Sequence, residues 1–450
     1  MEKSLALVMV LVLVASSILG VSSVKGESRT IVVPEDYATL SLAIHNAGDG
    51  DTVFVKRGTY QEEAITINKS ISLIGEGINE TILSLNPPLV EVWHFHNLIW
   101  VPETAIKINA NDVKIQGFTI NLPEDSYGVV SGIHAVGDGI SFIDNEVANR
   151  SNAYLSGSML NVTYNSISGA LEVAGSNTTI TNNTIKHTLK VQGTFNLISA
   201  NRIGGGYYSN NIYLSGSFNC IVDNSVSSMQ MDNSNSNFIV SNSFVNLDLT
   251  KLGGGCFDNI ISKNQVNGNL GINDGIWLWN GKNNTISANS IRNCENGLTL
   301  GTTGKTAVEN SIYLNNFVNN TNHVVSLSGS NHTVNQFDNG VKGNYYDDYH
   351  GNDANWDGVG DSPYTVQETH WDEELQSDVT IVFFQDNYPL MSPFDIDHFS
   401  VELPEWASDA LSTFPEPETP EPFPTLAVAS VIIVVVVSVG LLLYFKKRKH

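Results

Sequence analysis

Residues 283–291 read NNTISANSI, a stretch of Asn, Ser, Thr and Ala around two isoleucines that carries no charge. Similar text stands at 176–185 (SNTTITNNTI) and at 236–244 (SNFIVSNSF). A single stretch of this kind is typical of a loop. Its recurrence instead indicates a repeat, in which each copy takes an equivalent place in the fold.

An Asn-x-(Ile/Val/Phe) pattern brings these stretches into one alignment, with consecutive asparagines 18 to 26 residues apart. The aligned asparagines are Asn145, Asn165, Asn183, Asn201, Asn224, Asn242, Asn264, Asn289, Asn315 and Asn335. A second apolar-x-apolar segment precedes most of them, beginning at Leu171, Leu189, Ile212, Met229 and Ile276. No helical text separates the two kinds of segment, so the pattern excludes α/β units.

Short alternating segments are strands with one buried face, and this spacing predicts an all-β solenoid whose turns pair with the turns above and below. Isoleucines point inward, Ser and Thr point outward, and the asparagine takes a corner of the coil. Asn suits a corner because it tolerates the left-handed conformation and because its amide can bond to the same amide one turn away. Ten turns at about 4.8 Å each make a rod roughly 50 Å long.

The segment 31–60, IVVPEDYATLSLAIHNAGDGDTVFVKRGTY, predicts an N-terminal capping helix for this rod. Leu40, Ile44 and Ala47 share one helical face, and Gly48 and Gly50 end the helix before the next strand. A helix over the open end of a solenoid covers edge strands that would otherwise aggregate.

Both ends of the chain carry membrane signals. Residues 1–26 are predicted to be a secretory signal peptide, with an apolar run at 5–15 followed by small residues. Residues 425–445 are uncharged and apolar, which predicts one C-terminal transmembrane helix of roughly 30 Å; the alternative is a buried core helix. The basic tail at 446–450 then lies in the cytoplasm, so we expect a single-pass protein of the cell membrane with an extracellular ectodomain.

The ectodomain divides by composition and pattern. Its predicted units are the N-terminal cap and first coils at 27–127, the solenoid repeats at 128–340, an acidic C-terminal cap at 341–404 and a Pro/Glu stalk at 405–424. The net charge of −24 favours cations as partners and disfavours nucleic acid and anionic polymers. Three cysteines, Cys220, Cys256 and Cys294, are too few for a disulfide framework, and the sequence leaves their pairing open.

Two stretches resemble a known family. GDGDTVFVKRGTYQEEAITINKSISLIGEG at 48–77 resembles the opening of right-handed parallel β-helix proteins of the pectin-lyase-like superfamily, in particular the NosD-like group. GNYYDDYHGNDANWDGVGDSPY at 343–364 resembles the closing segment of NosD-like surface proteins of archaea. The resemblance implies the right-handed β-helix, where the repeat alone indicates only a β-solenoid. It also implies a link to copper delivery for nitrous oxide reductase.

Copper has two candidate ligand pairs in this sequence. Met229 and Met231 are soft ligands of the kind that Cu(I) prefers. However, they stand at the two apolar positions of an apolar-x-apolar segment, which Leu, Ile and Val fill in other copies of the repeat. His94 and His96 alternate on one face of a predicted strand, without a third ligand nearby. We interpret the methionines as core residues and the histidines as surface residues.

Calcium has a better candidate in the acidic C-terminal segment. Asp353, Asn355, Asp357 and Asp361 place oxygen ligands at intervals, the Val359 carbonyl is a further ligand, and Gly358 stands where such a loop bends sharply. The twelfth position is Tyr364 instead of Glu, so a bidentate carboxylate must come from elsewhere. The alternative is a solvated turn, because residues 347–424 hold 19 acidic and no basic residues. We predict a structural Ca²⁺.

The outward residue of each apolar-x-apolar segment forms a predicted stripe, and its members are Glu172, Lys190, Tyr213, Gln230, Asp248, Trp277 and Thr299. Trp279 shares a face with Trp277, and sugar rings stack on exposed aromatic rings of this kind unless insertions cover them. We predict a surface binding or structural module for glycans, with Trp277, Trp279 and Tyr213 as ligand-binding residues. No catalytic residue is assigned. The alternatives are a polysaccharide lyase or hydrolase on the same scaffold and a NosD-type copper-maturation factor.

Overall fold

The computed structural model describes residues 28–94, 97–122, 132–149, 151–204, 212–249, 255–268, 274–301, 307–326, 335–372 and 377–412. Within these ranges, no helix has the length and apolar character that crossing a bilayer requires. The predicted signal peptide, the segment 425–445 and the basic tail lie outside them.

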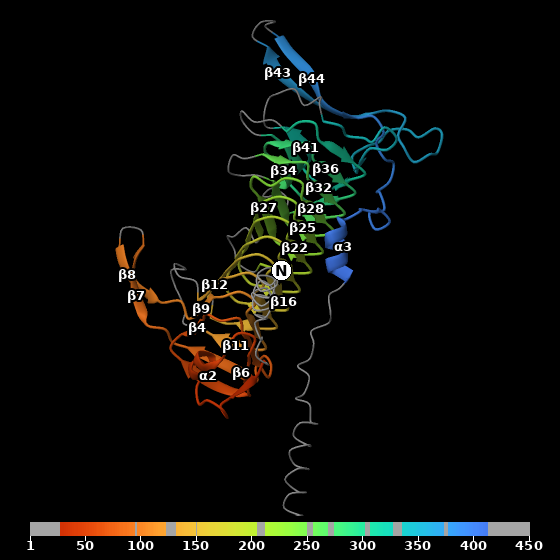
Figure 1. Cartoon of the computed structure of the whole chain (residues 1–450). Coiled ribbons are helices and arrows are strands. Elements are labelled where there is room, and N and C mark those ends of the chain that lie inside the picture. Colours follow the sequence, from red (N-terminus) through yellow and green to blue (C-terminus); the bar gives the residue numbers. More distant parts are fainter. Residues whose placement is uncertain are drawn as a thin grey trace, which may run out of the picture.

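The described part of the chain winds into a rod with three parallel sheets, which we name A, B and C (Figure 1). Sheet A consists of β1 (Thr30–Val33), β2 (Thr52–Val55), β5 (Ser72–Gly75), β10 (Lys114–Gln116), β13 (Ser141–Ile143), β16 (Asn161–Thr163), β19 (Thr179–Thr181), β22 (Leu197–Ser199), β25 (Cys220–Val222), β28 (Phe238–Val240), β32 (Ile260–Ser262), β36 (Thr285–Ser287) and β39 (Ser311–Tyr313). Sheet B consists of β3 (Gly58–Glu62), β6 (Thr81–Leu85), β11 (Thr119–Asn121), β14 (Glu146–Val147), β17 (Ser166–Ile167), β20 (Thr184–Ile185), β23 (Arg202–Ile203), β26 (Ser225–Val226), β29 (Ser243–Phe244), β33 (Gln265–Asn267), β37 (Ser290–Arg292), β40 (Asn316–Val318) and β42 (Tyr345–Tyr346). Sheet C consists of β4 (Ile65–Ile67), β9 (Ile106–Asn109), β12 (Ile133–Val136), β15 (Ala153–Ser156), β18 (Leu171–Ala174), β21 (Leu189–Gln192), β24 (Ile212–Ser215), β27 (Ser228–Met231), β30 (Asn246–Leu249), β34 (Asp274–Leu278), β38 (Asn296–Leu300) and β41 (Asn322–Ser326).

Each turn of the coil contributes one strand to each sheet, in the chain order A, B, C. The parallel pairs are in register, so equivalent residues of successive turns lie directly above one another; Ile180, Ile198 and Ile221 are consecutive partners in sheet A. All three side chains are fully buried, as are Ile185 and Ile203 in sheet B. The predicted inward isoleucines are therefore confirmed, and in-register stacking explains why the same apolar residue types recur at each turn.

The predicted asparagine ladder lies at the corner between sheets A and B. The side-chain oxygen of each asparagine accepts bonds from the backbone N–H and the side-chain amide of the asparagine one turn earlier, as Asn224 does from Asn201 at 3.0 Å each. Its own amide donates to Asn242 of the next turn at 3.0 Å and to the carbonyl of Ile198 at 2.8 Å. The ladder runs from Asn145 to Asn344, and its side chains are almost completely buried.

The corner between sheets C and A holds a second ladder that the alignment did not separate from the first. Its members are Asn196, Asn219, Asn237, Asn259, Asn284, Asn310 and Asn335. Asn335 therefore belongs to this ladder, and Asn344 follows Asn315 in the first one, which corrects the predicted alignment at its last member.

The left-handed residue at these corners is not the ladder asparagine. It is the residue before it, for example Ala200 (φ 53°) before Asn201 and Asp223 (φ 56°) before Asn224. Our expectation that the ladder asparagine itself adopts this conformation is wrong. Asparagine is required here for its amide, which both donates and accepts at every turn.

Additional elements lie at the ends and along the side of the rod (Figure 1). Helix α2 (Leu40–Asn46) begins at the N-cap Thr39, buries Leu40, Ala43 and Ile44, and contacts strands β1 to β4. Antiparallel hairpins β7–β8 (Leu89–His94, Asn97–Pro102) and β43–β44 (Tyr364–Asp372, Ser377–Asp386) project from the rod, and β31 (Cys256–Phe257) pairs with β35 (Gly281–Lys282).

The C-terminal part of the described chain returns to the middle of the rod as helix α3 (Glu405–Ser412) (Figure 1). Ala407 is buried against Leu197, Cys220 and Val222 of sheet A. We expected residues 405–412 to be the first part of the Pro/Glu stalk, but they form an amphipathic helix. Its apolar residues, such as Ala407 and Leu411, pack on apolar side chains of sheet A.

Candidate functional site

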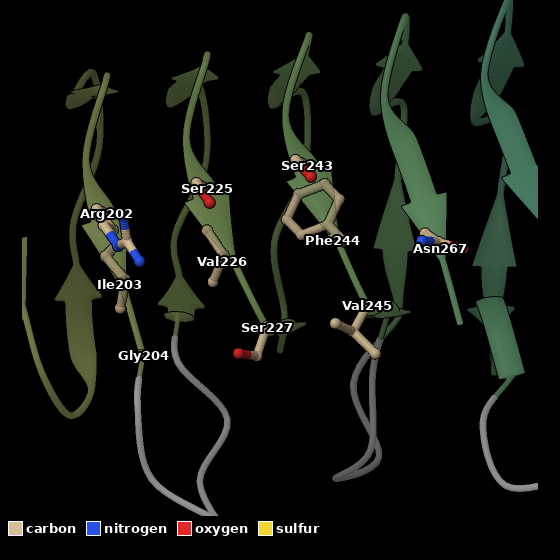
Figure 2. A pocket seen from close by; sticks show the side chains of 10 residues that line it. All are labelled: Arg202, Ile203, Gly204, Ser225, Val226, Ser227, Ser243, Phe244, Val245 and Asn267. Atoms are coloured by element: carbon tan, nitrogen blue, oxygen red, sulfur yellow. The ribbon is translucent and has the colours of Figure 1, made fainter. Parts of the chain in front are cut away.

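A groove lies on the outer face of sheet B, across four successive turns of the coil (Figure 2). It encloses about 280 Å³. Its lining residues are Arg202, Ile203, Gly204, Ser225, Val226, Ser227, Ser243, Phe244, Val245 and Asn267. Strands β23, β26, β29 and β33 supply most of them, each adding one rung to the groove.

The short strands of sheet B determine which side chains the groove presents. In Arg202-Ile203, Ser225-Val226 and Ser243-Phe244, the first residue is exposed and the second is buried in the core. Parallel register places Arg202, Ser225 and Ser243 next to one another on consecutive rungs. The outer surface is therefore a row of hydroxyl and amide groups that begins with a guanidinium.

Sequence reasoning missed this groove although the signal was present. Its exposed residues are the middle residues of the Asn-x-(Ile/Val/Phe) pattern at Asn201, Asn224 and Asn242. The repeat is defined by the residues on either side of these middle positions, and the predicted binding stripe, with its tryptophans, belongs to sheet C instead.

Basic residues surround the groove. Arg202 lies within it, Lys186 follows the strand that pairs with β23, and Arg292 lies opposite Asn267 in the register of β33 and β37. Within the described part of the chain, Arg202 and Lys186 have no ion pair, and the Arg292 guanidinium bonds to the Ser290 hydroxyl. None of the sheet B strands from β17 to β40 contains Asp or Glu.

The predicted aromatic residues lie on the neighbouring sheet C. The rings of Trp277 and Trp279 are stacked, with centroids 5.8 Å apart and planes 17° apart, and both are half-buried. The Trp277 indole N–H donates to the Gly301 carbonyl at 3.1 Å. Tyr213 is also half-buried, and desolvation raises the pKa of its phenol.

The predicted stripe on sheet C is only partly outward-facing. Gln230 and Thr299 are buried, so they do not offer a binding surface, contrary to expectation. Glu172 and Lys190 pair with each other at 2.7 Å, and the side chain of Asp248 lies outside the described part. The two tryptophans and Tyr213 thus remain the ligand-binding candidates of this sheet.

The candidate copper residues have a different environment from a metal site. Met229 and Met231 are fully buried in the core, in register with Ile212 and Leu214 of the preceding turn. The structure agrees with their interpretation as packing residues. His96 and the side chain of His94 lie outside the described part.

The candidate calcium residues form one loop. The Asp353 carboxylate accepts the backbone N–H groups of Asp357 and Gly358, at 3.2 and 2.9 Å. Asp357 accepts the N–H of Val359 at 2.9 Å, and Asp361 accepts that of Ala354 at 2.8 Å. Gly358 has a φ of 84°, as the predicted sharp bend requires.

These bonds use part of the acceptor capacity of each carboxylate and leave further lone pairs, so the donor set suits a hard cation. In the described ranges, no three His, Cys, Asp or Glu side chains are arranged to hold a metal ion.

A titratable cluster that the sequence did not single out lies near the last turn. The His323 Nε2 atom is 3.0 Å from an Asp347 oxygen and 3.2 Å from an Asp348 oxygen, and the His323 side chain is buried. The Tyr364 hydroxyl donates to Asp348 at 3.2 Å, and burial raises the pKa of Tyr364. Asp347 and Asp348 belong to the GNYYDDY stretch that carried the resemblance, which was the available signal.

All three cysteines are buried, and no disulfide joins them. Burial raises the pKa of Cys220 to about 12 and that of Cys294 to about 11, so neither thiol is a ready nucleophile or metal ligand at neutral pH.

Comparisons with known proteins agree with this architecture. Residues 168–351 match the sequence model of the NosD family, described as a periplasmic copper-binding protein. No curated protein matches the chain. The A-module of the Azotobacter vinelandii mannuronan C-5 epimerase AlgE6 superposes with a TM-score of 0.52 and 13% identity, over 68% of this chain and 98% of that module.

Two further solved structures are less similar. The PL6 family alginate lyase AlyGC has a TM-score of 0.44 and 13% identity, over 84% of this chain and 59% of the lyase. The polygalacturonase from Erwinia carotovora ssp. carotovora has a TM-score of 0.34 and 13% identity, over 67% of this chain and 93% of the enzyme. With the family match, the epimerase module and the three all-parallel sheets, the fold is a right-handed parallel β-helix of the pectin-lyase-like type.

Proposed function

We propose that this protein is a cell-surface module that binds glycans along the outer face of its β-helix. The observation that carries the proposal is the groove on sheet B, a row of exposed hydroxyl and amide side chains that ends in Arg202. Sugars present many hydroxyl groups, and such side chains can both donate to them and accept from them. The rungs repeat about every 4.8 Å, comparable with the length of one hexose unit.

The stacked indoles of Trp277 and Trp279, with Tyr213, form a second contact region of the same module. They lie on sheet C, which follows sheet B around the coil, and a half-buried ring still offers an edge or face to a sugar. A polymer held in the groove can reach these rings only by crossing the corner between the two sheets.

The anchoring of the module is proposed from the sequence. The signal peptide at 1–26, the transmembrane helix at 425–445 and the basic tail at 446–450 place the β-helix outside the cell. Residues 405–412 pack on sheet A as α3, so the stalk of this proposal is limited to residues 413–424. Helix α2 contacts β1 to β4 and, in this proposal, serves as the N-terminal cap.

A structural Ca²⁺ at Asp353, Asn355, Asp357, Val359 and Asp361 completes the proposal for the C-terminal cap. Ca²⁺ bound to the folded state stabilises it by RT ln(1 + [Ca²⁺]/Kd), so we expect the midpoint of thermal unfolding to rise with the logarithm of the Ca²⁺ concentration above the dissociation constant, and Asp357→Asn to lower that response. An equal response to Mg²⁺, or none to Ca²⁺, would remove calcium from the proposal.

A competing function is a copper-related role, favoured by the family description that residues 168–351 match. The discriminating measurement is the metal content of the purified full-length protein after exposure to Cu(I). Stoichiometric copper that survives a Met229→Leu/Met231→Leu change would direct attention to His94 and His96.

The glycan proposal is tested with the full-length protein in detergent, using dextran and polygalacturonate as probes and recording retention and product release together. Ser225→Tyr and Ser243→Tyr fill the groove and should each weaken retention about tenfold, equivalent to about 1.4 kcal/mol. Ser141→Tyr, on sheet A, is the matched control. Retention unchanged by either groove variant would refute the site, and released fragments would make the protein an enzyme on this scaffold.

A further inference from the structure

The charge of the groove face is opposite to that of the whole chain. The protein carries 46 acidic and 22 basic residues, yet the strands of sheet B from β17 to β40 contain two arginines and no acidic residue. Lys186 directly follows one of these strands. A local excess of positive charge in a strongly acidic protein is a specific feature of this face, because random placement would favour acids about two to one.

The basic groups are placed at the two ends of the groove. Lys186 and Arg202 mark one end. Lys186 lies one turn before Gly204 of the groove, because the Gly204 backbone N–H bonds to the carbonyl of Ile185, the residue next to Lys186, at 2.9 Å. Arg292 marks the other end, paired in register with Asn267. Figure 2 shows Arg202 and Asn267 on the outer rungs, with the serines between them.

The charge of these side chains is available to a ligand. Lys186, Arg202 and Arg292 are exposed, and in the described part of the chain they have no acidic partner. Asp223 lies near the groove at the corner between sheets A and B, but Lys263 is its charged neighbour and its own burial raises its pKa. An exposed guanidinium without a partner is well suited to a planar carboxylate or a sulfate.

We infer that the sheet B groove selects an acidic glycan, with Arg202 and Lys186 binding an anionic group at one end, Arg292 another beyond Asn267, and the serine hydroxyls holding the sugar units between them. This inference rests on the proposed glycan function and adds the ligand class. It also revises the expectation that the net charge disfavours anionic polymers. Physiological salt limits the reach of the overall repulsion to about 8–10 Å, and it weakens pairing between charges in contact much less.

Acidic glycans fit this face better than nucleic acid does. The ten groove residues include one aromatic ring, Phe244, and it is buried in the core. Binding of single-stranded nucleic acid relies on exposed rings for base stacking. Serine hydroxyls and an asparagine amide instead match the hydroxyl-rich faces of sugars.

The test compares polymers that differ only in charge, using full-length protein in detergent with a chelator present. The first pair is polygalacturonate and its fully methyl-esterified form; the second is dextran sulfate and dextran, which separates sulfate from carboxylate recognition. The variant is Arg202→Gln/Lys186→Gln. The control, Arg57→Gln/Lys342→Gln, removes the same charge from exposed positions outside the groove face. Circular dichroism verifies folding of both.

We expect the wild-type protein to bind an acidic polymer at least about tenfold more tightly than its neutral partner, since one charge-assisted bond corresponds to about this factor. The groove variant should lose that preference, so that it binds the acidic and the neutral polymer about equally, while the control keeps the preference. Raising the salt concentration should weaken only the acidic interaction.

Each contrary result has a separate meaning. Equal binding of charged and neutral polymers that Ser225→Tyr still abolishes would overturn the acidic class and leave the glycan function standing. Retention of no polymer would overturn both. A preference for single-stranded DNA over polygalacturonate, lost in the groove variant, would replace the glycan by nucleic acid.

Discussion

The three corners of the coil follow two different designs. The corner between sheets A and B always has two residues between its strands from β13 to β40, a left-handed one and a ladder asparagine, as in Asp223-Asn224. From β14 to β41, the corner between sheets B and C varies from a single residue, such as Ser227, to the eight residues 204–211. The first repeats one hydrogen-bonded geometry, and the second accommodates insertions.

The ladder that stabilises the coil and the groove that we propose as the binding site lie at different corners. At the corner between sheets A and B the ladder asparagine stands directly before the next strand and bonds to the turns before and after it, so an insertion beside it would leave buried polar groups unpaired. Among the described residues of the corner between sheets B and C, no such ladder runs from β17 to β34, and the groove lies beside this corner, with Gly204, Ser227 and Val245 at its margin. The corner between sheets C and A also varies, from the four residues 216–219 to the ten residues 301–310, so from β13 to β40 only the corner between sheets A and B keeps a constant length.

The largest effect is expected from breaking a ladder in its middle. Asn224→Ala removes the acceptor of two bonds from Asn201 and the donor to Ile198 and Asn242, all buried. We expect unfolding to become easier by about 4 kcal/mol, because several buried groups lose partners together.

The measurement is denaturant unfolding combined with hydrogen exchange in the neighbouring turns, since a solenoid need not unfold in one step. Ser225→Ala, at the next residue but exposed, is the control and should change stability by less than about 0.5 kcal/mol. Equal effects of the two changes would contradict the structural importance of the ladder.

The next effect concerns the C-terminal end of the same ladder. Asn344 donates its backbone N–H to the buried carboxyl of Asp386 at 2.7 Å. Desolvation raises the pKa of Asp386 to about 7, from 3.8. Between these values the folded protein holds a proton that the unfolded chain releases, so stability should fall by about 2 kcal/mol from pH 5 to pH 7.

Thermal or denaturant unfolding at several pH values checks this prediction. Asp386→Asn should remove this component of the pH dependence, while the exposed Asp397→Asn should retain it. A wild-type stability that rises between pH 5 and pH 7 through Asp386 would show that the carboxyl is ionised in the fold.

A smaller effect tests the interpretation of the buried methionines. Met231→Leu keeps the volume of the side chain, so it should cost less than about 1.5 kcal/mol. If Met229 and Met231 only pack the core, copper content after exposure to Cu(I) stays the same in this variant. Loss of bound copper with little loss of stability would assign them a metal-binding role instead.

The smallest effect is expected at the corner that varies. Inserting Gly-Ser-Gly after Gly169, between β17 and β18, should cost less than about 1 kcal/mol, because loop entropy grows slowly with length. The same insertion between Tyr164 and Asn165 of that turn displaces a ladder asparagine and should cost several times more. Comparing the two unfolding free energies measures the contrast between the corners directly.

Much of the fold was predictable from residues alone. The Asn-x-(Ile/Val/Phe) pattern indicated parallel turns, inward isoleucines and an asparagine ladder, and the structure confirms all three. The second ladder was not separated because its asparagines, such as Asn284, stand only five residues from those of the first. Residues 405–412 were grouped with the stalk since eight residues, about two helical turns, are too few to show a clear apolar period.

The candidate site was less predictable, because residues from four turns form it. Arg202, Ser225 and Ser243 are separated by 23 and 18 residues in sequence, and only the register of sheet B makes them neighbours. The same holds for His323 with Asp347 and Asp348, which meet where sheet C ends near the last strand of sheet B.

The sequence by itself determined that the chain is an all-β coil and which residues face its core, because a periodic pattern of apolar residues and asparagines allows only one repeated way to bury them. Tertiary structure alone decided which exposed residues lie together. The number of residues inserted at each corner between sheets B and C does not alter the register, so side chains far apart in the chain meet on one face. That face carries positive charge in an acidic protein, a property that net composition could not reveal.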